Sequence, residues 1–265
     1  MSQRQTPAKS RLEMSSPLPR RAILSGLAGA SALLVHRAAR GEAAAPASGA
    51  KTQPAPAAPP ALSGTHTLQP LPFKPAALRG LSERMITSHH ENNYGGAVRN
   101  LNRVEQELAR ITADTPPLVV AALRERELSF RNSKLLHEAY FANLGGDGKR
   151  SGAADRALAA AYGSAARWEE HLRATALGLG GGSGWVVVGL ELDTGAIRTA
   201  ASTSHTQALA AAVPLLVLDM YEHSYQMDYG AQAARYIDAF LANVQWDEVN
   251  RRYERAQRAA AALRG

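Results

Sequence analysis

The sequence predicts an α+β fold, in which an N-terminal antiparallel helical hairpin is followed by a small three-stranded antiparallel sheet packed with helices. Two observations predict it. Apolar residues recur at helical spacing through residues 76–144, whereas residues 185–218 contain three short runs rich in branched residues. We therefore expect a helical hairpin domain at residues 68–148 and an α/β domain at residues 151–262.

The first 45 residues differ in composition from the rest of the chain. They carry seven basic and two acidic side chains, and so account for +5 of the net charge of +7. The pair Arg20-Arg21 precedes a weakly apolar run at residues 22–35 that is too short to span a bilayer. Small residues at 43–45 offer a cleavage site. This pattern predicts a twin-arginine-type export signal at residues 1–45, and hence a periplasmic or secreted protein.

Two alternatives stay open for this leader: an uncleaved basic tail, and a true start at Met14. Residues 46–67 are expected to form a disordered linker because most of them are Ala, Pro, Ser and Thr. Since the excess of basic residues lies in the leader, we expect no nucleic-acid partner, and no membrane association after signal removal. The absence of cysteine excludes disulfides, thiolate metal sites and cysteine catalysis.

Two long helices are predicted in the hairpin domain. The first extends over residues 76–111, with a weak point at Gly95-Gly96, and the second over residues 118–144. Pro116-Pro117 separates them, because proline cannot continue a helix and restricts the residue before it. The apolar positions that define the first helix are Leu78, Leu81, Met85, Val98, Leu101, Val104, Leu108 and Ile111.

The α/β domain begins with a predicted helix at residues 154–177. The glycine-rich segment that follows, residues 178–184, lacks the lysine of a phosphate-binding loop and leads into a strand, so it does not indicate a nucleotide site. The remaining predicted elements are strands at residues 185–190, 197–202 and 215–218, a hairpin turn at residues 193–195, and helices at residues 236–244 and 246–262.

The third predicted strand ends in a pattern typical of a metal site. Asp219 follows the buried run directly, and His223 lies four residues later. Carboxylate oxygen and imidazole nitrogen are common ligands of Zn, Fe and Mn. The alternative is that Asp219 caps the next turn and that His223 is packed or exposed. His89 or His90 on the first helix, and His137 on the second, offer further nitrogens, because a helical hairpin can bring such residues together.

Six segments, taken in order, resemble the iron/manganese superoxide dismutase family and together cover residues 68–260. They are LQPLPFKPAAL, SHHENNYGGAVRNLN, LHEAYFANLGG, GSGWVVV, DMYEHSY and NVQWDEVNRRYE. The resemblance implies superoxide as substrate, which is converted to dioxygen and hydrogen peroxide by one-electron cycling of a mononuclear Mn or Fe, one ion per subunit. It identifies the metal ligands as His89, His137, Asp219 and His223, with His90 as the competing register for the first.

The resemblance also assigns the surroundings of the ion. Trp185 and Tyr221 would form an apolar wall, with Tyr221 in place of the family's usual Trp. His205 would donate a hydrogen bond to the metal-bound solvent, with Gln207 as the fallback, because Ser133 at the alternative position on the second helix is too short. This pattern is similar to the manganese-type or metal-tolerant branch.

Glu222 resembles the glutamate that bonds a ligand histidine across the family's dimer interface. The resemblance therefore implies a homodimer through Glu222 and His223. Gln232 and Ala233 stand where the family has an arginine before the closing helix, with Arg235 nearby.

The gateway to the ion departs from the family pattern. Asn93 and Ala97 stand where the family has a His and a Tyr, and Gln226 stands where it has an aromatic residue. Tyr94 is expected to supply a substitute hydroxyl. Losing a positioned proton donor typically lowers a rate by on the order of 10²- to 10⁴-fold.

This departure keeps two alternatives open. One is an exported metal-binding protein of the same fold with little or no dismutase turnover. The other is a hydrolytic zinc enzyme that uses Glu91 or Glu138 as its base. The sequence does not choose between Mn and Fe.

Overall fold

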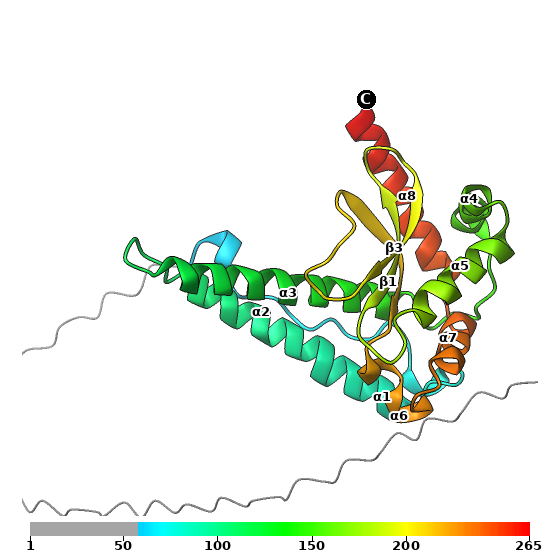
Figure 1. Cartoon of the computed structure of the whole chain (residues 1–265), viewed down its shortest axis with the longest axis horizontal. Coiled ribbons are helices and arrows are strands. Elements are labelled where there is room, and N and C mark those ends of the chain that lie inside the picture. The colour runs from blue at the N-terminus through cyan, green and yellow to red at the C-terminus, as the bar shows by residue number, and fades with distance from the viewer. Residues whose placement is uncertain (1–57) are drawn as a thin grey trace, which may run out of the picture. The chain divides into compact units, whose positions relative to one another are not determined.

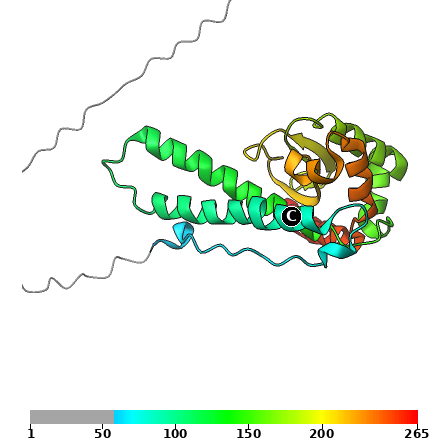
Figure 2. The same ribbon diagram turned by 90° about the horizontal axis from the view of Figure 1, so that it is seen from below.

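The computed structural model describes residues 58–265 (Figure 1). The predicted export signal and residues 46–57 of the predicted linker lie outside the described residues. A helical hairpin projects from one side, and a sheet with its covering helices lies on the other (Figures 1 and 2). The α+β prediction is confirmed. None of the described helices is long and apolar enough to cross a membrane.

Residues 58–67, the described end of the predicted linker, lie against the hairpin. They contain a short 3-10 turn, η1 (Pro60–Leu62). The backbone N–H of Gly64 donates to Oε2 of the buried Glu105 (2.9 Å), and that of His66 donates to Oδ1 of Asn102 (2.8 Å). Ordered contacts therefore begin before residue 68. A second 3-10 turn, η2 (Pro75–Ala77), follows.

The first long helix is built from three consecutive pieces, α1 (Glu83–Ser88), a π-helical turn η3 (His89–Tyr94) and α2 (Gly95–Leu108). It begins at Glu83 rather than at residue 76, because the Ser82 hydroxyl caps it by accepting the Met85 N–H at 3.1 Å. The expected weak point at Gly95-Gly96 coincides with the end of the π-helical turn. π-Turns inside α-helices are frequent at functional sites.

The second long helix, α3 (Pro117–Ala142), runs back beside α2 and completes the predicted hairpin (Figure 2). At its end the Asn143 amide donates to the main-chain oxygen of Leu215 (3.0 Å) and accepts the N–H of Val217 (3.0 Å). These two buried bonds join the helical half of the chain to the third strand of the sheet.

The helix predicted at residues 154–177 is wrong as a single element. The structure has two, α4 (Gly152–Tyr162) and α5 (Ala165–Leu177). Gly163 ends α4 with φ at 87°, a left-handed conformation that glycine adopts without strain. The next residue, Ser164, caps α5 by accepting the Arg167 N–H (3.1 Å).

The sheet contains β1 (Trp185–Glu191), β2 (Ile197–Ser202) and β3 (Ala212–Asp219) in the order β2-β1-β3, all antiparallel as predicted. Trp185 pairs with Asp219 on β3 and with Ser202 on β2, so the start of β1 meets the end of both neighbours. The third strand begins three residues earlier than predicted and includes Pro214. An edge strand tolerates this proline.

Four helical elements close the chain: η4 (Glu222–Ser224), α6 (Gln226–Tyr229), α7 (Ala233–Ala242) and α8 (Trp246–Arg264). The last two correspond to the predicted closing helices, with α7 starting three residues earlier. One hydrophobic core joins both halves of the chain, and its largest fully buried side chains include Trp168, Trp185, Tyr94, Tyr140, Tyr236 and Phe240.

Candidate metal centre

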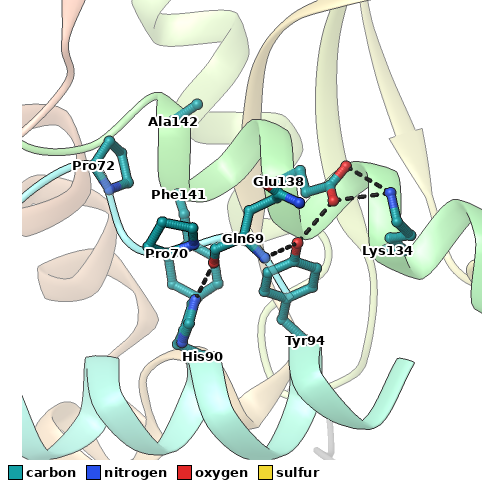
Figure 3. Close-up of a pocket in the computed structure, with 9 residues that line it drawn as sticks. All are labelled: Gln69, Pro70, Pro72, His90, Tyr94, Lys134, Glu138, Phe141 and Ala142. Atoms are coloured by element: carbon teal, nitrogen blue, oxygen red, sulfur yellow. Dashed lines mark hydrogen bonds and ion pairs between the residues drawn. The ribbon is translucent and has the colours of Figure 1, made fainter. Parts of the chain in front are cut away.

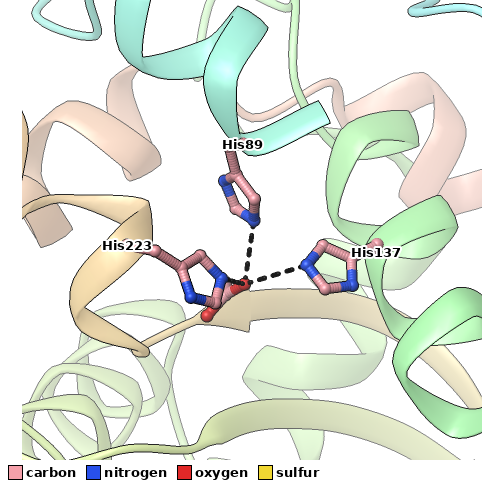
Figure 4. A group of neighbouring side chains, drawn as sticks. His89, His137 and His223 are labelled. Carbon is pink, nitrogen blue, oxygen red and sulfur yellow. Dashed lines mark hydrogen bonds and ion pairs between the residues drawn. The ribbon is translucent and has the colours of Figure 1, made fainter. Parts of the chain in front are cut away.

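Four side chains from four elements meet at the seam between the helical hairpin and the sheet (Figure 4). His89 starts the π-helical turn η3, His137 lies on α3, Asp219 ends β3 and His223 lies in η4. One ligand-type atom from each lies within 4.8 Å of the others. The predicted convergence is therefore found, and it is His89 rather than His90 that takes part.

A single carboxylate oxygen is the focus of this cluster. The Nε2 atoms of His89, His223 and His137 lie 3.1, 3.3 and 3.7 Å from Oδ2 of Asp219. Three nitrogens and one oxygen converging in this way match the donor types that Fe, Mn and Zn accept.

Burial sets the charge state of the cluster. His89, His137 and Asp219 are almost fully buried, whereas the side chain of His223 is 28% exposed. Burial lowers the pKa of His89, and lowers the pKa of His137 to about 3. Burial alone would raise the pKa of Asp219, but the neighbouring His223 and His89 outweigh it and hold that pKa well below its usual range. The buried part of the site thus presents the neutral imidazoles of His89 and His137 and the Asp219 carboxylate, the protonation states in which these groups bind metals.

The hydrogen bonds of His137 show that a cation fits here. Its Nδ1–H donates to the main-chain oxygen of Ser133 at 2.7 Å, so Nε2 carries a lone pair and no proton. This Nε2 is buried and has no hydrogen-bond partner among the described residues, although it faces the Asp219 carboxylate. A buried lone pair opposite a carboxylate is unfavourable unless a cation or a hydrogen-bond donor lies between them, and here a metal ion would bind both. The four residues therefore fit a metal ion.

Asp219 is held by hydrogen bonds that could not be predicted from the sequence. The hydroxyls of Ser224 (2.8 Å) and Tyr236 (2.7 Å) both donate to the main-chain oxygen of Asp219. The Tyr221 N–H donates to the carboxylate oxygen Oδ1 (2.9 Å). Oδ2 is left to face the three imidazoles. The sequence carries no clear signal for Tyr236, because its helix also contains the charged residues Arg235 and Asp238.

Three further predicted residues form a layer beside the cluster. The indole Nε1–H of Trp185 donates to Nδ1 of His205 at 2.9 Å. Tyr221 stacks on His205, with ring centroids 4.8 Å apart, and also on His223 at 5.5 Å. Burial lowers the pKa of His205, so its imidazole is neutral. The predicted fallback, Gln207, instead accepts hydrogen bonds within its own loop from Thr203.

The predicted gateway residues occupy different surroundings. Asn93 is half-buried, Ala97 is buried and Gln226 is exposed. The Tyr94 ring stacks against His137 with centroids 6.0 Å apart. Its hydroxyl, however, donates to Oε1 of Glu138 at 2.7 Å, on the side of a cavity of about 450 Å³ (Figure 3).

Several other predicted residues lie on the surface or in this outer layer. Glu91 and Glu222 are exposed, and His90 donates through Nε2 to the main-chain oxygen of Gln69 at 2.7 Å. Arg235 lies over the Tyr229 ring, 5.7 Å from its centroid. Glu138 is bound by Tyr94 and Lys134, an arrangement that does not favour the role of a hydrolytic base.

Comparison with known proteins identifies the family. A family model described as iron/manganese superoxide dismutases, C-terminal domain, matches residues 150–252. A superoxide dismutase [Fe] of Cupriavidus metallidurans is 44% identical over 194 residues, which are 73% of this chain and 98% of the relative. A superoxide dismutase [Fe] of Aquifex aeolicus is 33% identical, covering 76% of this chain and 98% of the relative. A superoxide dismutase [Mn] 1 of Halobacterium salinarum is 32% identical, covering 72% and 96%. This chain belongs to the iron/manganese superoxide dismutase family.

Proposed function

We propose that this protein is a superoxide dismutase that converts superoxide to dioxygen and hydrogen peroxide. The observation that carries the proposal is the convergence of His89, His137, Asp219 and His223 on one point, with a buried Nε2 lone pair of His137 that no described residue satisfies. These four side chains would hold the ion. When bound, Fe or Mn supplies the one-electron couple that lets one superoxide be oxidised and the next be reduced.

His205 is our candidate for the hydrogen-bond donor on the substrate side of the site. Because its Nδ1 accepts from Trp185, the proton of the neutral imidazole lies on Nε2, which stays available as a donor. Tyr221 fixes the plane of the ring by stacking on it. Trp185 therefore selects the tautomer and Tyr221 selects the orientation, two properties that tune how such a group acts beside a metal.

We infer that either Fe or Mn supports the reaction in this chain. Similar relatives are named for each metal, and the nitrogen and oxygen donors here suit both ions. Loading the metal-free protein with each ion in turn, and measuring turnover per bound ion, tests this inference. Activity with one ion and none with the other would contradict it.

We also propose a homodimer through Glu222 and His223. Glu222 is exposed and His223 is the one ligand whose side chain reaches the surface, at 28% exposure, so a partner subunit has direct access to both. Sedimentation of the wild type and of Glu222→Ala measures this. The variant is expected to shift toward monomer and to lose metal more readily, and an unshifted variant would contradict the proposal.

The twin-arginine pattern at Arg20-Arg21 supports export of the protein to the periplasm or beyond the cell. Replacing both arginines by lysine should retain the protein inside the cell. Equal amounts outside the cytoplasm for wild type and variant would refute a twin-arginine route.

The proposed activity is tested by measuring superoxide decay directly on protein of known metal content. Two superoxide ions should yield one dioxygen and one hydrogen peroxide per cycle, at a rate proportional to bound Fe or Mn. The matched control is His137→Ala, which removes one ligand and should lose metal and activity together. A wild-type protein that holds a full complement of Fe or Mn and does not accelerate superoxide decay would favour the alternative, a metal-binding protein without turnover.

A further inference from the structure

The two ligands of the helical half are carried by different segments, which must be held in register. His89 begins the π-helical turn η3, and His137 lies near the end of α3. Their rings meet edge to face with centroids 5.1 Å apart. A contact that joins η3 to α3 at this level therefore helps to set how the two Nε2 atoms face Asp219, together with the bond from His137 to Ser133.

Tyr94 provides such a contact. It ends the same π-helical turn that His89 begins, and its ring stacks on His137 with an interplanar angle of 18°. Its hydroxyl donates to Glu138 (2.7 Å), the residue next to His137, and accepts the backbone N–H of Gln69 (3.0 Å). Lys134, one turn earlier on α3, contacts both oxygens of the Glu138 carboxylate, Oε1 at 2.9 Å and Oε2 at 3.1 Å.

The backbone of Gln69 links Tyr94 to His90. Its N–H binds Tyr94, and its carbonyl oxygen accepts from Nε2 of His90, the residue next to His89 (2.7 Å). Figure 3 shows these bonds running from His90 through Gln69 and Tyr94 to Glu138 and Lys134. One continuous network thus connects His90 and Glu138, the chain neighbours of the ligands His89 and His137.

We propose that Tyr94 is a positioning residue for the metal centre, which sets the mutual orientation of His89 and His137 through its bond to Glu138. This assigns it a role different from the gateway hydroxyl that the sequence suggested. The inference rests on the proposed metal centre, and its test reads metal retention and the optical spectrum rather than turnover. Changes to groups that orient metal ligands typically weaken metal affinity by about 10- to 100-fold.

A cavity beside this network makes it possible to remove the Tyr94 hydroxyl without leaving its partners unsolvated. A cavity of about 450 Å³, lined in part by Tyr94, Glu138 and Lys134, adjoins the hydroxyl. In Tyr94→Phe the ring keeps its place against His137, while water entering the cavity can solvate Glu138 and the Gln69 N–H. The variant is therefore expected to fold with its positioning bond removed.

The chain supplies a matched control in Tyr162, on α4. Its hydroxyl also donates one hydrogen bond, to Thr199 Oγ1 (2.8 Å), and accepts one backbone N–H, from Thr199 (2.9 Å). Tyr94→Phe and Tyr162→Phe thus remove the same pattern of bonds. Only the first removes it beside the ligands.

The experiment follows metal transfer from the manganese- or iron-loaded full chain to a chelator, together with the visible spectrum of the oxidised ion. Tyr94→Phe should release metal about tenfold faster and shift the absorption band, whereas Tyr162→Phe should match the wild type in both. Glu138→Ala should reproduce Tyr94→Phe. Glu138→Gln should restore wild-type behaviour, because the amide oxygen can still accept from Tyr94.

The outcomes separate this inference from the proposed function. If Tyr94→Phe and Glu138→Ala hold metal and absorb light as the wild type does, the positioning role is refuted and the dismutase proposal stands. Equal effects of Tyr94→Phe and Tyr162→Phe would likewise refute it, since a loss of stability alone would then explain both. If the wild type itself retains neither Mn nor Fe, the proposed function fails, and this inference with it.

Discussion

Replacing Tyr236 by phenylalanine should destabilise the protein by an amount that its hydrogen bonds determine. The hydroxyl is fully buried, donates to the main-chain oxygen of Asp219 (2.7 Å) and lies 3.2 Å from the Tyr140 hydroxyl. Tyr236 is the donor toward both oxygens, so its hydroxyl is shared between Asp219 and Tyr140. In Tyr236→Phe, Asp219 keeps the bond from Ser224, but the buried Tyr140 hydroxyl loses its hydrogen-bond partner.

The magnitude follows from these partners. One lost hydrogen bond is worth about 1 kcal/mol, and an orphaned buried hydroxyl adds about 1 kcal/mol or more, so Tyr236→Phe should cost about 2 kcal/mol. Tyr140→Phe leaves the bond from Tyr236 to Asp219 intact and should cost about 1 kcal/mol or less. The double variant removes the orphan together with its partner. It should therefore cost less than the sum of the single variants.

Chemical denaturation of metal-depleted protein at a fixed concentration measures these free energies of unfolding without interference from metal release. For a chain of this size, 2 kcal/mol corresponds to a fall in Tm of about 4–8 °C. Additive single variants, or a Tyr140→Phe variant that costs as much as Tyr236→Phe, would show that the two hydroxyls are not coupled in this way.

Three further predictions concern the metal site and the residues around it. His205→Ala should change the reduction potential of the bound ion, while the metal content stays near that of the wild type. His205→Gln should retain more of the original potential. Loss of metal from His205→Ala would instead indicate that His205 is a ligand. Because burial depresses the pKa of His137 from 6.5 to about 3, the unfolded chain binds a proton that the folded apoprotein excludes between these values. The free energy of unfolding should therefore fall by up to about 1.4 kcal/mol per pH unit below about pH 6.5, and urea midpoints that do not change with pH would contradict this. Ser82→Ala removes the cap of α1 and should cost about 1 kcal/mol, with an unchanged thermal midpoint as the contrary result.

The hairpin and the sheet could be predicted because their signals are local. Pro116-Pro117 separates two helical patterns, and the three short branched runs gave the strands β1, β2 and β3 close to their observed bounds. The break at Gly163 was missed because a single glycine inside a helical pattern is often tolerated. The π-helical turn at His89–Tyr94 was also missed, since its hydrogen-bond register leaves no mark on the spacing of apolar residues.

Some features of the candidate site could also be predicted from the sequence, and others could not. His89, His137, Asp219 and His223 were predicted as a set because the segments that contain them resemble the ligand segments of the iron/manganese superoxide dismutase family. The main-chain oxygens of Ser133 and Asp219 that orient the cluster were not, because every residue has such an oxygen and only the fold decides which one a ligand meets. The direction of the Tyr94 hydroxyl, toward Glu138, depends likewise on how η3 packs against α3.

The contacts that hold the ligands explain how the gateway can differ while the metal site is retained. His137 is oriented by a main-chain oxygen, and Asp219 by Ser224 and Tyr236. Asn93, Ala97 and Gln226 take no part in these bonds. Substitutions at these three positions are therefore expected to leave the bonds that orient the ligands intact. Restoring a hydroxyl by Ala97→Tyr should alter turnover at constant metal content, whereas loss of metal in that variant would show that the gateway and the ligand positions are mechanically coupled.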